Sequence, residues 1–511
     1  MAILRSVQFP TSRIFRFLSL ATIAATVSLA GSIFSLTSSE WKVEGVPIAF
    51  WAWRNEAPRQ RDVTDAVDKA RARTLFLRAG QIDWQDGEIK RIRPVHGHLP
   101  TGIELHLVYN ATRALLTKLD QADENVLATT IVKAFNQDIE RARRERVHIA
   151  GLQLDIDMPT RLLGRYKKLL AATRKSLEPG IQLSITGLPA WMESSELKAT
   201  LKEVNFWIPQ FYGSELPERL DQMVPISSTD DITHFVKQAR DLDENFYAGL
   251  AAYSWSTLYS ASGSLISLRG DLDLATIAAD SNLELVDQRR FGTTSTNEWR
   301  YTFRARTDGV TGGLIMRSGE HLVIDVPNSN SLQAAAKVVR ELAGKRLKGI
   351  CIFRLPSPDD PATLSVEQVG TALNDQEPAP RFNVRITRQR SSPGTWILEL
   401  ANVGTASVQA QTLNIDLQLT PGSIETVRSP SGTSVQTLCT DNDHLAPCSE
   451  LRASVLRIRI PFLEPGQLTT TSIGLKADPP TTIPAALTLK TNADQTYEFT
   501  YQLVTDDGLT P

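Results

Sequence analysis

Two aspartates placed two positions apart, Asp155 and Asp157, are the residues of this chain whose types and spacing most clearly indicate chemistry. They lie in the segment GLQLDIDMPT at residues 151–160, whose apolar residues predict a buried strand. Side chains two positions apart in a strand share one face, so both carboxylates point the same way. Burial and mutual repulsion raise the pKa of such carboxylates, which is one way to obtain a general acid near neutral pH.

The elements around this segment predict an α/β fold, a (β/α)8 barrel of the TIM type over residues 42–375. Eight short apolar segments alternate there with helical patterns, such as Leu162, Tyr166 and Leu169 on one amphipathic face. Repeated strand–helix alternation is typical of such barrels. The predicted strands are VPIAFWAW, TLFLRAG, IELHLVYN, IAGLQLDID, IQLSITG, VNFWIPQFYG, FYAGLAAY and KGICIFRLP.

The residues that end these strands predict one polar face. The carboxyl ends of barrel strands hold active or binding sites, and the two-residue period assigns each residue to a face. Aromatic rings, including Trp191 and Trp255 just beyond strand ends, can stack on sugars, although each alone could equally pack the barrel top. The predicted polar face comprises Trp51, Trp53, Arg78, Asn110, Asp155, Asp157, Thr186, Gln210, Tyr212, Tyr253 and Arg354.

Arg78 and Arg354 allow two interpretations. Either arginine could form a structural ion pair with Asp155 or Asp157, which would keep the aspartates charged and argue against an acid role. Alternatively, an arginine in the barrel mouth could bind an anionic sugar. We favour the structural ion pair.

Composition excludes several classes of function. The chain has 511 residues, with 55 Lys and Arg against 57 Asp and Glu, so no basic field indicates nucleic-acid binding. No phosphate-binding glycine loop or nucleophile elbow is evident, and His96 and His98 lack a third ligand at recognisable spacing. We therefore predict neither a cofactor nor a metal, and we expect Cys351 to be a buried core residue.

Residues 1–36 predict export. Three arginines precede an apolar run at residues 17–36, in which Ser28-Leu29-Ala30 resembles a cleavage site. The run is nearly long enough to span a bilayer, so we keep both a cleaved signal peptide and an uncleaved anchor as alternatives. Either places the protein in the periplasm or on the outward face of the inner membrane, with membrane contact through this segment alone.

Two further β-rich regions are expected. Residues 256–327, approximately, form an insertion after the seventh strand that serves as a wall or lid, or as a structural layer. Residues 381–506 predict a small C-terminal β-sandwich, a spacer or stabilising domain with glycan or partner binding as the alternative. Cys439 and Cys448 lie close together in a loop-like stretch and predict a disulfide, which fits an exported protein.

Several segments together resemble a bacterial family known as domain of unknown function 3142. They are VPIAFWAW, GLQLDIDMPT, LSITGLPAWM, PQFYG and GICIFRLPSPDD, spread over roughly residues 46–375. The resemblance implies a glycosidase-type barrel in an exported protein, without an established substrate or reaction. More distantly, LDIDMP and QFYG are similar to the fourth-strand and sixth-strand signatures of chitinase-like family 18 glycoside hydrolases.

The distant resemblance implies residue roles and one defect. Asp157 matches the aspartate that supports the substrate's acetamido group, Asp155 the deeper aspartate, and Tyr212 the tyrosine beside them. Pro159 stands where those enzymes carry the glutamate that donates a proton to the leaving sugar. The acid must therefore be Asp157 itself or a carboxylate from another loop, for which the candidates are Glu193 and Glu215.

Two functions follow from these features. The first is an exported glycoside hydrolase that uses Asp157, with Asp155 and Tyr212, on a polysaccharide or envelope glycan. The second is a non-catalytic barrel that lost its acid at Pro159 and binds glycan or scaffolds the envelope. Carbohydrate is the expected partner in both, and the sequence predicts no oligomeric state. We favour the enzyme, and a second carboxylic acid about 5–10 Å from Asp157 across a groove would support it.

Overall fold

The computed structural model describes residues 45–213, 215–291, 298–357, 362–392, 394–408, 413–430, 433–441, 444–490 and 495–506. The predicted export segment at residues 1–36 lies outside these ranges. None of the helices in the described ranges combines the length and the apolar character that crossing a membrane requires.

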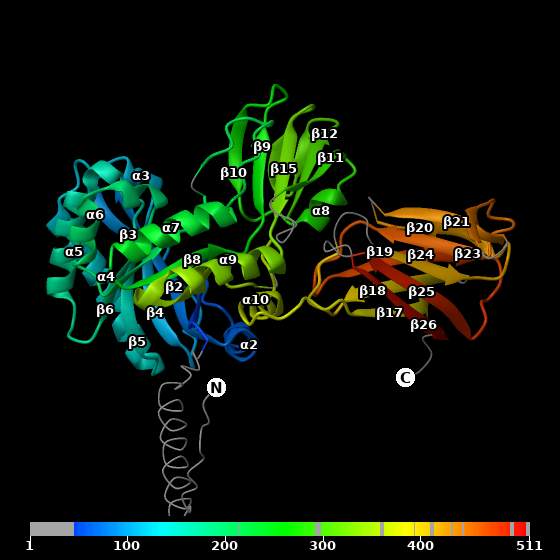
Figure 1. The fold of residues 1–511 in the computed structure, drawn as a ribbon, viewed down its shortest axis with the longest axis horizontal. Helices are drawn as coiled ribbons and strands as arrows, with labels where there is room; N and C mark the ends of the chain where they lie inside the picture. Colours follow the sequence, from blue (N-terminus) through cyan, green and yellow to red (C-terminus); the bar gives the residue numbers. More distant parts are fainter. Residues whose placement is uncertain are drawn as a thin grey trace, which may run out of the picture. The chain divides into compact units, whose positions relative to one another are not determined.

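The eight predicted strands form a closed parallel barrel (Figure 1). The barrel closes because the first strand pairs in parallel with both the second and the last. The predicted fold class is therefore confirmed. The barrel strands are β1 (Ile48–Ala52), β2 (Ala72–Gln85), β4 (Glu104–Ala111), β5 (Ile149–Asp155), β6 (Gln182–Gly187), β7 (Phe206–Pro209), β8 (Phe246–Ala251) and β16 (Leu347–Phe353).

Helices in the connections between the strands pack around the barrel, and α4 (Glu124–Glu145) illustrates why they form. The Asp123 carboxylate accepts hydrogen bonds from two backbone N–H groups of the first turn. Apolar residues from Leu127 to Ile139 recur every three to four positions and are buried. The left-handed residue Arg146 ends the helix. The other helices are α2 (Gln60–Ala70), α3 (Arg113–Leu116), α5 (Leu163–Ser176), α6 (Glu196–Leu201), α7 (Thr229–Asp241), α9 (Ser329–Leu342) and α10 (Val366–Leu373).

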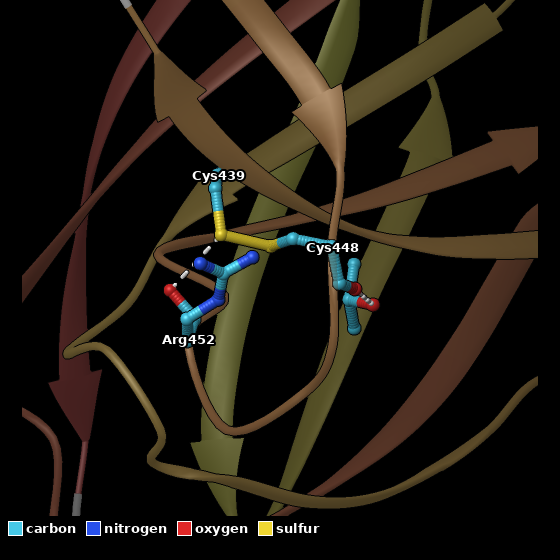
Figure 2. The surroundings of a disulfide bond; sticks show 4 residues. Cys439, Cys448 and Arg452 are labelled. Atoms are coloured by element: carbon cyan, nitrogen blue, oxygen red, sulfur yellow. Dashed lines mark hydrogen bonds between the residues drawn. A yellow bond between two sulfur atoms is a disulfide. The ribbon is translucent and has the colours of Figure 1, made fainter.

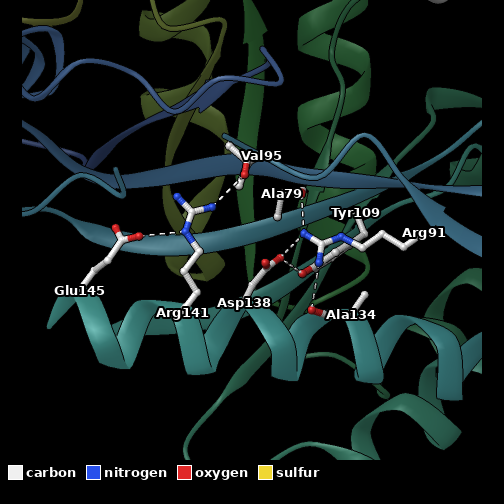
Figure 3. Close-up of polar contacts among 8 residues, drawn as sticks. All are labelled: Ala79, Arg91, Val95, Tyr109, Ala134, Asp138, Arg141 and Glu145. Atoms are coloured by element: carbon white, nitrogen blue, oxygen red, sulfur yellow. Dashed lines mark hydrogen bonds and ion pairs between the residues drawn. The ribbon is translucent and has the colours of Figure 1, made fainter. Parts of the chain in front are cut away.

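A buried polar network ties α4 to the extension of β2, which pairs with the antiparallel strand β3 (Glu88–Ile92). Figure 3 shows Arg91 and Asp138 at its centre, with 2.5 Å between Arg91 Nη2 and Asp138 Oδ2. Arg91 Nη2 also donates to the Ala79 carbonyl at 2.9 Å. The Tyr109 hydroxyl donates to Asp138 Oδ2 at 2.6 Å. Asp138 thus joins a helix, a hairpin and a barrel strand.

Asp138→Ala is expected to lower the free energy of unfolding by about 2–3 kcal/mol, because it leaves a buried guanidinium and a buried hydroxyl without their shared acceptor. Urea unfolding followed by circular dichroism measures the change. Glu140→Ala, on the exposed side of the same helix, is the matched control and is expected to unfold like the parent. Equal stability of the Asp138 variant and the parent would contradict this account of the network.

The barrel interior is filled by aromatic side chains and one short polar chain. Trp51 Nε1 donates to Gln153 Oε1 at 2.7 Å, and Gln153 Nε2 donates to Ser184 Oγ at 3.3 Å. Phe76, Phe206 and Tyr247 pack against one another in the same cluster as Trp51. Cys351 is buried in the same cluster with a free thiol, which confirms its predicted place in the core.

A five-stranded antiparallel sheet follows β8 in the chain, where an insertion was expected. Its core is formed by side chains such as Leu258, Tyr301 and Ile324, and Phe462 of the C-terminal region packs edge-on against Tyr301 with 4.9 Å between ring centroids. Its strands are β9 (Trp255–Tyr259), β10 (Leu265–Arg269), β11 (Leu283–Phe291), β12 (Glu298–Ala305) and β15 (His321–Val326), accompanied by α8 (Leu274–Ala278) and the hairpin β13 (Gly309–Thr311) and β14 (Leu314–Met316).

The C-terminal region is a mostly antiparallel β domain, as the fold-class prediction requires. Its strands bury alternate residues around one core, as Trp396, Leu398 and Leu400 do in β18. Cys439 and Cys448 form a disulfide across the β21–β22 hairpin, which Figure 2 shows. The strands are β17 (Phe382–Arg388), β18 (Thr395–Asn402), β19 (Leu413–Gln418), β20 (Ile424–Arg428), β21 (Ser434–Asp441), β22 (His444–Pro447), β23 (Val455–Ile460), β24 (Leu468–Leu475), β25 (Thr482–Lys490) and β26 (Thr496–Asp506).

Candidate active site

Asp155 and Asp157, called the aspartate pair below, lie at the carboxyl end of β5. Asp155 is the last residue of the strand and is half-buried, whereas Asp157 is exposed. Thr186 Oγ1, at the same end of the neighbouring β6, donates to Asp155 Oδ1 at 2.6 Å. None of the described residues hydrogen-bonds to the carboxylate of Asp157. The deeper carboxylate is thus held in place while the outer one is open to solvent.

The electrostatics of the aspartate pair favour a shared proton. Burial and the charge of Asp157 raise the pKa of Asp155 to about 7, although the Thr186 hydrogen bond and the charge of Arg78 lower it. Desolvation also raises the pKa of Asp157, even though part of its side chain reaches solvent. Two interacting carboxylates titrate as a pair. Such a pair retains a proton near neutral pH, as a general acid must.

Asp155 is expected to make the protein less stable as the pH rises. Its ordinary pKa is 3.8 and its folded pKa is about 7, so between these values the folded state binds more protons than the unfolded state. The free energy of unfolding must therefore fall from about pH 4 to about pH 7 and stay constant above. Asp155→Asn should remove this fall and raise Tm at pH 7.5 by on the order of 1–3 °C. Calorimetry of parent and variant at pH 4.5 and 7.5 measures the change in Tm between the two pH values. A larger fall in Tm in the variant than in the parent would contradict the prediction.

The favoured ion pair between an arginine and the aspartate pair is absent among the described residues, so this interpretation was wrong. Arg78 Nε donates to Asn110 Oδ1 at 3.1 Å, and Arg78 Nη1 donates to the Trp53 carbonyl at 3.1 Å. Arg354 Nη2 donates to the carbonyl of Gly270, in the insertion, at 2.8 Å. Both hydrogen bonds of Arg78 are thus to neutral acceptors, and one hydrogen bond of Arg354 is to the insertion.

Phe353 is the centre of an aromatic cluster in the mouth, and the sequence analysis missed it. Its ring centroid lies 5.5 Å from that of Trp53, 5.3 Å from that of Tyr253 and 6.1 Å from that of Tyr212. These four residues are called the aromatic cluster below. Tyr212 and Tyr253 are buried, with 9% and 8% exposed, whereas Trp53 and Phe353 are half-buried. The ring surface available to stack on a sugar therefore comes from Trp53 and Phe353.

The two-residue period could have identified Phe353. Cys351 faces the barrel core, so the next inward residue of β16 is Phe353 and not Arg354. Arg354 lies just past the end of the strand, with its guanidinium carbon 5.4 Å from the ring centroid of Tyr253. It therefore borders the aromatic cluster from outside the barrel interior.

Trp51 and Trp191 were predicted to contact substrate, but both are only 1% exposed. Trp51 donates to Gln153 in the barrel core. Trp191 Nε1 donates to the Met158 carbonyl at 2.8 Å, and its ring packs edge-on against Tyr166. Neither ring has a face open to a ligand. Trp191 instead holds the backbone beside Asp157.

The remaining predicted residues differ in what they contribute. Asn110 and Gln210 are half-buried at their strand ends, and Thr186 is buried against Asp155. Glu193, which ends a 3-10 helix at Pro189–Glu193, and Glu215, in the loop after β7, are both exposed. Neither glutamate is among the charges that act on the pKa of Asp155. Asp157 is therefore the acid candidate that this geometry offers.

Comparison with known families gives a specific match for the central part of the barrel. Residues 113–288 match the model of a family described as Domain of unknown function (DUF3142). The predicted resemblance is confirmed for this segment. The DUF3142 segment contains β5 to β8 and therefore the aspartate pair and Tyr212.

Solved structures of chitinase-like proteins are similar to the chain at low identity, and none of the curated proteins matches it. The spore cortex-lytic enzyme SleL of Bacillus cereus is 13% identical with a TM-score of 0.43, over 65% of this chain and 75% of that one. A chitinase of Chromobacterium violaceum is 12% identical with a TM-score of 0.43, over 65% and 100%. The chitinase-like agglutinin RobpsCRA of Robinia pseudoacacia is 13% identical with a TM-score of 0.38, over 62% and 99%.

The insertion begins within the DUF3142 segment and supports the loop between β7 and α7, which carries Tyr212. Tyr259 OH donates to the Pro217 carbonyl at 3.2 Å. Arg300 on β12 donates to the carbonyls of Gln222 at 2.8 Å and Val224 at 3.1 Å. The insertion therefore contributes hydrogen bonds that hold this loop in place.

Proposed function

We propose that the protein is an exported glycoside hydrolase that binds a glycan in the barrel mouth and uses Asp157 as its general acid. The observation that carries this proposal is the aspartate pair, which no described cation neutralises and whose pKa values are raised. Structural carboxylates are ordinarily paired with cations, whereas a carboxylate kept protonated near neutral pH is available for proton transfer.

Each residue of the mouth has a separate role in the proposed reaction. Asp157 donates its proton to the glycosidic oxygen as the bond from that oxygen to the sugar carbon breaks, and the bonding electrons leave with the oxygen. In the form of the pair that reacts, the one proton lies on Asp157, so Asp155, held by Thr186, is charged and lies beside the developing oxocarbenium ion. Water then adds its hydroxyl to the sugar carbon and returns a proton to Asp157. The aromatic cluster stacks on the sugar rings.

Export rests on two features of the chain. Residues 1–36 have the composition of a signal peptide or an anchor, and the disulfide between Cys439 and Cys448 suits an oxidising compartment. We therefore place the protein in the periplasm or on the outward face of the inner membrane.

A glycan-binding barrel without hydrolysis is the second candidate, and Pro159 favours it. In chitinase-like enzymes this position carries the proton-donating glutamate, whereas proline has no proton to donate. The aromatic cluster would still bind sugar in such a protein.

Reducing-end release from a panel of bacterial envelope and environmental polysaccharides tests both candidates. The assay uses residues 37–511, beside the same chain with Asp157→Asn. Release by the parent alone supports the hydrolase. Retention of a polysaccharide without release supports the binding barrel, and absence of both release and retention across the panel overturns both proposals.

A further inference from the structure

Arg78 carries a half-buried positive charge in the mouth without a carboxylate in contact. Its two hydrogen bonds within the described residues, to the Asn110 side chain and the Trp53 carbonyl, are both to neutral acceptors. The guanidinium carbon also lies over the indole of Trp53, 5.4 Å from the ring centroid. These contacts fix the position and the plane of the guanidinium, and they leave Nη2 without a hydrogen-bond acceptor among the described residues.

The surroundings of Arg78 do not compensate its charge. Burial and the nearby charge of Arg93 lower its pKa, and Asp155 opposes this only from beyond ion-pair distance. Asp155 itself retains a proton near neutral pH, so its charge is incomplete there. An anion bound at Nη2 would supply the missing compensation, because an opposite charge in contact favours the charged form of the side chain.

Arg354 places a second guanidinium at another edge of the aromatic cluster. Its guanidinium carbon lies 5.4 Å from the Tyr253 ring centroid and 5.8 Å from that of Phe353. Arg78 stacks on Trp53, and Trp53 in turn contacts Phe353. A sugar ring stacked on Trp53 would therefore lie beside Arg78, and Arg354 borders the opposite part of the cluster at Tyr253.

We propose that the glycan bound in the mouth is carboxylated, as in a polymer that contains uronic acids, and that Arg78 binds one of its carboxylates. Arginine binds carboxylates through two parallel hydrogen bonds, and the neutral hydroxyls of an uncharged sugar would leave its charge uncompensated. The inference rests on the proposed glycan-binding mouth and holds for the hydrolase and the binding barrel alike.

The test compares polymers that differ only in charge. Polygalacturonate, glucuronan and alginate are each offered to the full chain beside their carboxyl-reduced forms, and affinity is measured by calorimetry. We expect at least one carboxylated form to bind roughly tenfold or more tightly than its reduced form, with a preference that weakens in high salt. Arg78→Gln should weaken binding of that form by roughly ten- to a hundredfold, and Arg78→Lys by less. Arg143→Gln, at an exposed arginine near the carboxyl end of the outer helix α4, is the matched control and should bind like the parent.

The outcomes separate this inference from the proposed function. Equal affinity for the carboxylated and carboxyl-reduced forms of every polymer, or no binding of any polymer, overturns the carboxylate assignment. It is also overturned if Arg78→Gln still binds the carboxylated form more tightly than the reduced form. If a carboxyl-reduced polymer is hydrolysed, so that new reducing ends appear, the proposed hydrolase function stands and the inference that its substrate is carboxylated fails. If Arg78→Gln does not fold, the charged and reduced polymers still decide the question on the parent.

Discussion

Asp157→Asn is expected to abolish reducing-end release while leaving the folded protein almost unchanged. Asparagine keeps the shape of the side chain and removes the proton that the carboxylic acid would donate. General acid catalysis contributes roughly 10²–10⁴-fold, so kcat/KM should fall by at least about 10²-fold. Asp157 is exposed and has no hydrogen-bond partner among the described residues, so Tm should stay within about 1 °C of the parent value.

Initial rates on the best polysaccharide of the panel measure this effect, and calorimetry measures Tm. Asp68→Asn, at an exposed carboxylate on the outer helix α2, is the matched control and should leave both unchanged. Parent activity should also decline as the pH rises past the titration of the aspartate pair, because the acid is then lost. Undiminished release by Asp157→Asn would contradict the assignment and move the search to Glu193 and Glu215.

The barrel could be predicted from the sequence because its signals are local. Each strand is a short apolar run, and each connecting helix shows its own periodicity, as the buried residues of α5 do. The face on which each side chain lies also follows from a local rule, the two-residue period, as long as the residue is within a strand. This is why the side chains of Asp155 and Thr186 meet at neighbouring strand ends. The rule was misapplied at β16, where Arg354 lies beyond the strand and Phe353 is the inward residue.

The partners of the long side chains could not be predicted, because they come from distant parts of the chain. Arg354 donates to the carbonyl of Gly270, 84 positions away and inside the insertion. Trp191 is covered because its indole reaches the carbonyl of Met158. Residue types at strand ends therefore predict which side chains can reach the barrel mouth, while tertiary contacts such as these decide which of them are covered.

Asp325→Ala is expected to lower the free energy of unfolding by about 3–5 kcal/mol. Arg300 and Asp325 form two parallel hydrogen bonds of 2.6 Å, from Nε and from Nη2, and their side chains are only 6% and 3% exposed. Removal of the carboxylate leaves a buried guanidinium without its anion, which is far more destabilising than loss of an exposed pair. Chemical unfolding of parent and variant measures the difference. Asp120→Ala is the matched control, because Asp120 also accepts two hydrogen bonds from one arginine, from Nη1 and Nη2 of Arg161, but at the surface, and it should unfold like the parent.

A double variant tests whether the pair of Arg300 and Asp325 only stabilises the insertion or also positions the loop that carries Tyr212. Arg300→Met with Asp325→Leu leaves no buried charge, and replacement of a buried ion pair by apolar residues is often neutral or stabilising, so stability should largely return. The hydrogen bonds from Arg300 to the carbonyls of Gln222 and Val224 would still be lost, and the loop that carries Tyr212 would be held less firmly. We therefore expect glycan affinity or turnover to stay below the parent value although the fold recovers. Full recovery of both would mean that the pair stabilises the insertion and does not position the mouth.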